Sequence, residues 1–87
     1  MDPLAIEHAL LAVLAAGAGD QTTATSHIAR ATQLTRSTAR RERQVIEIAS
    51  LVVAGDRRRA AGLVLEHTVE FPGDADLLAR VAPGAAC

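Results

Sequence analysis

The sequence has no tryptophan, no tyrosine and no lysine, and it has one phenylalanine and one cysteine, Phe71 and Cys87. With almost no aromatic residues, a core must be built from alanine, leucine, valine and isoleucine, which favours closely packed helices over a sheet sandwich. A single cysteine excludes an intrachain disulfide and is typical of a reducing cytoplasm, where we expect the protein to act. The net charge of −1 gives no general attraction to nucleic acid or to an anionic membrane.

A long hydrophobic run is also missing. The longest one, residues 9–18, is too short to span a bilayer, and acidic residues rather than basic ones precede it, which is unlike a signal peptide. The chain of 87 residues is long enough for one small domain. We therefore predict a single all-α domain over residues 1–82 and a flexible tail over residues 83–87.

Hydrophobic periodicity predicts four helices and a short fifth one, over about residues 3–16, 20–34, 38–54, 56–71 and 74–81. Asp2, Asp20, Asp56 and Asp74 stand where N-caps are expected, as does Ser37 or Thr38 for the third helix. The third segment is rich in β-branched residues, a composition that also suits a buried strand, but its apolar spacing favours a helix. Gly62, inside the fourth segment, predicts a close approach of another helix.

Two Gly-Asp pairs, at Gly19 and Gly55, lie 36 residues apart, which indicates an internal repeat of helical hairpins. The residues around them resemble the tetratricopeptide repeat, whose pattern is W-x2-L-G-x2-Y on a first helix, then A-x3-F and a closing proline on the second. The matching positions are His8, Leu11, Ala12, Ala15, Ala24, Ile28 and Ala31 in the first unit, and Ala60, Val64 and Pro72 in the second. The first helix of the second unit departs from the pattern, although Leu51 falls at its last position. Residues 38–43, TARRER, also resemble a stretch in a bacterial subgroup similar to tetratricopeptide repeat protein 38.

The resemblance implies antiparallel helical hairpins, about two repeats plus a short capping helix, stacked in a right-handed superhelix whose groove binds peptide segments. It also implies roles for individual residues. Four polar residues of the third helix would contact a partner: Arg40, Arg43, Gln44 and Glu47. Ten residues would pack the repeats: Leu11, Ala12, Ala15, Ala24, Ile28, Ala31, Leu51, Ala60, Val64 and Pro72. We expect a non-catalytic bacterial module that binds another protein or forms a homodimer, because two repeats leave an open face.

Arginines clustered over residues 40–43 and 57–59 support a second hypothesis, a small regulator that contacts nucleic acid. A solvated face is the simpler interpretation of both clusters, since acidic residues dilute them and neither cluster contains an aromatic side chain that could stack on bases.

A third hypothesis, a metal-assisted hydrolase, would need the three histidines, His8, His27 and His67. No two of them share a helix at i, i+4 spacing, so we expect no metal, no cofactor and no enzymatic activity. We instead interpret His8 and His27 as packing residues. His67 with Glu70 is interpreted as a solvated pair on one helix.

Overall fold

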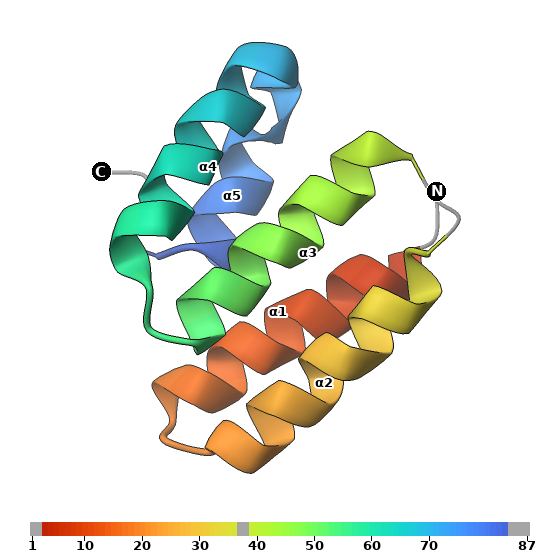
Figure 1. Cartoon of the computed structure of the whole chain (residues 1–87), viewed down its shortest axis with the longest axis vertical. Helices are drawn as coiled ribbons and strands as arrows, with labels where there is room; N and C mark the ends of the chain where they lie inside the picture. Colours follow the sequence, from red (N-terminus) through yellow and green to blue (C-terminus); the bar gives the residue numbers. More distant parts are fainter. Residues whose placement is uncertain (1–2, 37–38, 84–87) are drawn as a thin grey trace.

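The computed structural model describes residues 3–36 and 39–83 and is all-helical over them, with five α-helices and one short 3₁₀ turn (Figure 1). The elements are α1 (Pro3–Gly17), α2 (Gln21–Leu34), α3 (Arg40–Val53), α4 (Arg57–Glu70), η1 (Pro72–Asp74) and α5 (Ala75–Val81). The predicted all-α class and the five predicted helices are confirmed. The β-branched third segment is a helix. Asp2, Ser37 and Thr38, predicted as caps, and residues 84–87 of the predicted tail lie outside the described residues.

Both Gly-Asp pairs form the same turn, which explains why the chain folds into two hairpins. Gly19 and Gly55 have φ angles of +83° and +81°, in the left-handed region that glycine adopts without strain. The following aspartates then cap the next helices, since Asp20 accepts a hydrogen bond from the backbone N–H of Thr23 and Asp56 from that of Arg59. Hydrogen bonding from Thr23 lowers the pKa of Asp20. These two predicted caps are therefore confirmed.

The helices pack as two consecutive hairpins, with α3 lying between α2 and α4 and also packed on α1 (Figure 1). The short α5 lies behind α3 and α4 in this view and contacts both α1 and α3. The core contains mainly small and branched side chains: Ala5, Ala9, Val13, Ala31, Val45, Ile46, Ile48, Ala49, Val64, Leu78, Val81 and Ala82. The molecule measures 32 × 29 × 18 Å. Because a helix with its side chains is about 10–12 Å wide, the shortest dimension has room for no more than about two helices, and the helices keep exposed faces.

Two local predictions are wrong. Gly62 is exposed, and a Cβ atom built on it would meet nothing within 4 Å, so no helix approaches it closely. Asp74 lies at the N-cap position of α5 but its side chain makes no capping hydrogen bond. Its carboxylate points instead to two side chains of other helices, as described below.

Candidate functional site

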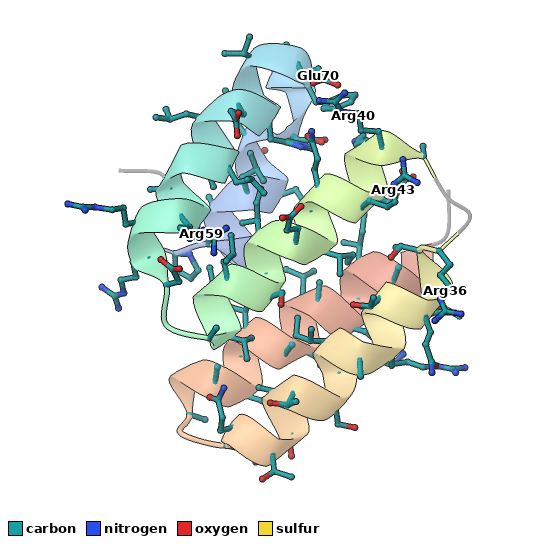
Figure 2. The ribbon with its side chains drawn as sticks, viewed as in Figure 1. Arg36, Arg40, Arg43, Arg59 and Glu70 are labelled. Carbon is teal, nitrogen blue, oxygen red and sulfur yellow. The ribbon has the colours of Figure 1, made fainter. Side chains whose placement is uncertain are left out.

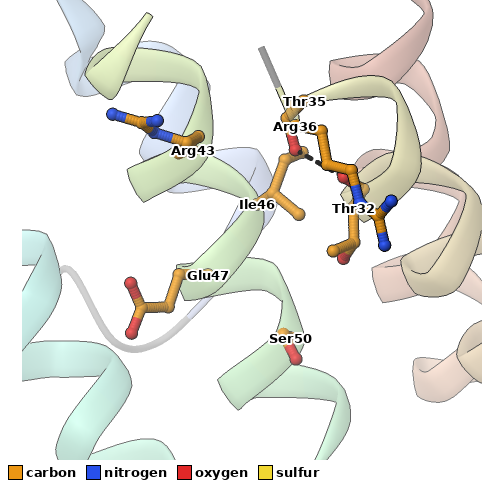
Figure 3. Close-up of a pocket in the computed structure, with 7 residues that line it drawn as sticks. All are labelled: Thr32, Thr35, Arg36, Arg43, Ile46, Glu47 and Ser50. Atoms are coloured by element: carbon orange, nitrogen blue, oxygen red, sulfur yellow. Dashed lines mark hydrogen bonds between the residues drawn. The ribbon is translucent and has the colours of Figure 1, made fainter. Parts of the chain in front are cut away.

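The outer face of α3 carries the four predicted partner-binding residues, but they flank two different grooves. Arg43 and Glu47 line a hollow of about 420 Å³ between α2 and α3, with Ile46 at its apolar side (Figure 3). Thr32, Thr35, Arg36 and Ser50 complete this lining. Arg40 and Gln44 lie on the other side of α3, in a hollow of about 390 Å³ whose α4 side is formed by Leu63, Glu66, Val69 and Glu70.

Acidic side chains of α4 and η1 form ion pairs with arginines in the first turn of α3. Arg40 forms an exposed ion pair with Glu70 at 3.1 Å (Figure 2). Arg41 donates from Nε and Nη2 to the two carboxylate oxygens of Asp74, at 2.7 and 2.6 Å. Three arginines near the positive end of a helix dipole are unfavourable by themselves, and these carboxylates offset that charge. Arg41 therefore holds the chain after α4 against the start of α3, and its predicted place on a solvated face is wrong.

Asp74 also contacts His67, a residue of α4 that is fully buried. Its Nε2 lies 2.7 Å from Oδ2 of Asp74, and its Nδ1 lies 2.7 Å from Oε1 of Gln44. Its ring also packs on Phe71, with the ring centroids 4.8 Å apart. The predicted solvated pair of His67 with Glu70 is wrong, because His67 lies on the buried stripe of α4 that also contains Ala60 and Val64.

Arg41, Asp74, His67 and Gln44 thus form one hydrogen-bonded network, and the opposite charges of Arg41 and Asp74 stabilise each other. The hydrogen bonds from Arg41, opposed by burial and assisted by His67, hold the pKa of Asp74 below its ordinary value. The same hydrogen bonds to Asp74 raise the pKa of Arg41. Asp74 therefore stays ionised and paired wherever the fold is intact above the acid range. Gln44, predicted to bind a partner, is half-buried, and its Oε1 serves as a hydrogen-bond acceptor towards Nδ1 of His67.

The outer face of α1 carries three of the exposed large hydrophobic side chains in the described part of the chain. Leu4, Leu11 and Leu14 are 53%, 47% and 70% exposed, and we call these three residues the leucine stripe. Leu14 also lines a hollow of about 310 Å³ with Leu10 and Arg80, where α5 passes beside α1. Glu7 lies in the middle of the stripe and is exposed. Leu65 and Val69 of α4 are exposed as well, on the opposite hairpin.

The ten residues assigned to repeat packing occupy different environments. Five are buried: Ala12, Ala24, Ala31, Ala60 and Val64. Ala15, Ile28 and Leu51 are half-buried. Leu11 belongs to the leucine stripe, and Pro72 begins η1 at the surface. The two exposed residues, Leu11 and Pro72, therefore lie at the surface of the repeat rather than between its helices.

The two remaining histidines of α1 and α2 lie next to each other. Nδ1 of His8 is 2.9 Å from Nδ1 of His27, and the ring centroids are 5.1 Å apart. A search for two histidines at i, i+4 spacing on one helix could not find this pair, because His8 and His27 belong to two helices that face each other. Alanines beside them, such as Ala12 and Ala31, are fully buried and let the two helices approach closely.

The two arginine clusters lie at opposite ends of the second hairpin, one at the start of α3 and the other at the start of α4 (Figure 2). A helix of 14 residues is about 20 Å long, so the fold does not join the clusters into one basic patch. No helix in the described ranges combines the length and the apolar character needed to cross a membrane.

Comparisons of the chain with protein-family models, with curated proteins and with solved structures found no match.

Proposed function

We propose that the protein is a small tetratricopeptide-like interaction module of the cytoplasm that works by pairing with a second copy of itself through α1. The observation that carries this proposal is the leucine stripe. Three leucines on one helix face, each about half to two-thirds exposed, form a surface whose burial is favourable. Full burial of one leucine is worth about 1.5–3 kcal/mol relative to full exposure, so covering the stripe gives association a driving force.

The charges beside the stripe support a second copy as the partner. In an antiparallel pair of α1 helices related by a twofold axis, Leu4 of one copy lies opposite Leu14 of the partner subunit. In that register Glu7 lies opposite Leu11 of the partner subunit, within one turn of the hollow that Arg80 lines. In this register each Glu7 would lie near Arg80 of the partner subunit, and the opposite charges would attract. This twofold symmetry is the usual arrangement of a homodimer, in which one surface matches itself.

Light scattering across a dilution series, with helicity followed by circular dichroism, tests the proposal. We expect a dimer mass at high concentration that falls to the monomer mass on dilution. Leu14→Gln should shift this transition to at least tenfold higher concentration. Leu65→Gln on α4 is a matched control, because Leu65 and Leu14 are both 70% exposed. A monomer at all concentrations, or equal effects of the two substitutions, would contradict self-association through α1.

A charge exchange tests the register. Glu7→Arg and Arg80→Glu should each weaken the dimer, since each places like charges together, and the double variant should recover most of the lost affinity. Independent, additive effects of the two changes would exclude the antiparallel register while leaving association through the leucine stripe standing.

A further inference from the structure

The side chains of His8 and His27 form a pair of imidazoles that spans the first hairpin. Their Nδ1 atoms are 2.9 Å apart, one on α1 and the other on α2, and the rings are tilted by 32°. Both residues are half-buried, so part of the pair is exposed to water and ions. The pair is independent of the leucine stripe and of the buried network around His67.

At this separation only one of the two Nδ1 atoms can carry a hydrogen. One ring therefore donates from Nδ1 and the other accepts with its Nδ1 lone pair. A metal ion that takes the place of this hydrogen would accept a lone pair from each ring. The donating ring would move its hydrogen from Nδ1 to Nε2 through solvent, so two neutral imidazoles would bind the ion without net release of a proton.

We propose that His8 and His27 form a binding site for a divalent transition-metal ion of tetragonal preference, Cu²⁺ first and Ni²⁺ second. Bonds from a metal to imidazole nitrogen are about 2.0–2.1 Å long, so two nitrogens 2.9 Å apart subtend an angle of about 90° at the ion. That angle suits neighbouring positions of a square-planar or tetragonal ion, whereas a tetrahedral zinc site needs a separation of about 3.3 Å. The rings reach this arrangement by turning about their Cβ–Cγ bonds until both lone pairs converge.

The rest of the coordination sphere would be water. In the described part of the chain no group of three or more histidine, cysteine, aspartate or glutamate side chains is placed to hold a metal ion. Two protein ligands give an exchangeable ion rather than a permanent one. Because the ligands come from α1 and α2, the bound ion would join the two helices and would bind the folded chain in preference to the unfolded one.

The test uses the full chain with Cys87→Ser, which removes the only thiol. Thermal unfolding is followed by circular dichroism with and without CuCl₂ or NiCl₂, and the stoichiometry is measured by calorimetry. A metal concentration one hundred times Kd raises the ratio of folded to unfolded chain about 100-fold, which corresponds to a rise in Tm on the order of 10 °C. We expect this rise, its reversal by a chelator, one ion per chain, and no effect of MgCl₂, since Mg²⁺ prefers oxygen ligands.

His8→Asn and His27→Asn are the decisive variants, because an asparagine amide can keep a hydrogen bond to the other ring while one metal ligand is lost. Each should fold with the helicity of the parent and lose at least tenfold in Cu²⁺ affinity. An absence of binding by the parent chain, equal binding by the variants, or a stoichiometry of one ion per two chains would overturn the proposal. Copper spectra of the parent that lack imidazole nitrogen coupling would do so as well, whatever the folding of the variants.

Discussion

Replacing Asp74 by asparagine should destabilise the protein strongly. Its carboxylate receives two hydrogen bonds from Arg41 and one from His67, and its side chain is only 8% exposed. Asparagine has a similar shape but no charge, so the guanidinium of Arg41 loses its counter-ion and the fully buried ring of His67 loses its carboxylate acceptor. Removing one member of a buried pair costs about 3–5 kcal/mol, and the partial exposure of Arg41 places the expected loss near the lower end, at about 3 kcal/mol.

Urea unfolding followed by circular dichroism measures this loss. At an m-value of about 1–3 kcal/mol per molar urea, the midpoint should fall by one molar or more. Asp76→Asn is the matched control two residues further along the chain, in α5, since Asp76 is exposed, and it should change stability by less than about 0.5 kcal/mol. Similar midpoints for the two variants would refute the view that the Asp74 network holds α4 and η1 against α3.

The pH dependence provides an independent check of the same network. The folded chain holds the pKa of Asp74 below its unfolded value of about 4, so the folded state binds fewer protons in the acid range. The stabilisation from this carboxylate is therefore fully present above about pH 4 and is lost as the pH falls further. Below pH 4 the stability of the parent chain should approach that of Asp74→Asn. A constant difference between the two from pH 7 down to pH 2 would contradict this assignment.

Two glycine substitutions should act in opposite directions, and both can be measured by the same urea titration. Gly62→Ala should stabilise the protein by about 1 kcal/mol, because Gly62 is an exposed helical residue with open space around its Cβ position; a loss of stability would reveal a contact at that site. Gly55→Ala should destabilise it by about 1–2 kcal/mol, because its φ of +81° strains any residue with a Cβ atom; an unchanged midpoint would mean that the turn can adopt another conformation.

The secondary structure could be predicted because its signals are local. Gly19 followed by Asp20, and Gly55 followed by Asp56, each combine a residue suited to positive φ with an N-cap side chain. Such a pair fixes both the end of one helix and the start of the next. The apolar period of the third segment likewise outweighed its β-branched composition, because tertiary packing on several sides favours the helix over intrinsic propensity.

The buried network could not be predicted in the same way, because its members are far apart in the sequence. Asp74 follows Pro72 and Gly73, a context that also suits an N-cap, and the local signal gave the wrong role. Two signals could have found the network. His67 continues the buried spacing of Ala60 and Val64, and Arg41 lies one turn before the buried Val45. A charged or titratable residue on an apolar stripe needs a buried partner, and Asp74 is one of the carboxylates close enough in sequence to His67 to supply it.

The same alanine-rich composition explains both the histidine pair and the leucine stripe. On α1 three inward positions are held by Ala5, Ala9 and Ala12, all fully buried, beside Val13, while the leucine stripe faces outward. Small inward side chains let α1 and α2 approach until His8 and His27 meet, but they bury little apolar area for each residue. Part of the apolar surface of α1, which in many helices would be buried in a core, is therefore exposed on its outer face. A chain arranged in this way gains from covering that helix, and this gain is the physical reason to expect association there before any other face.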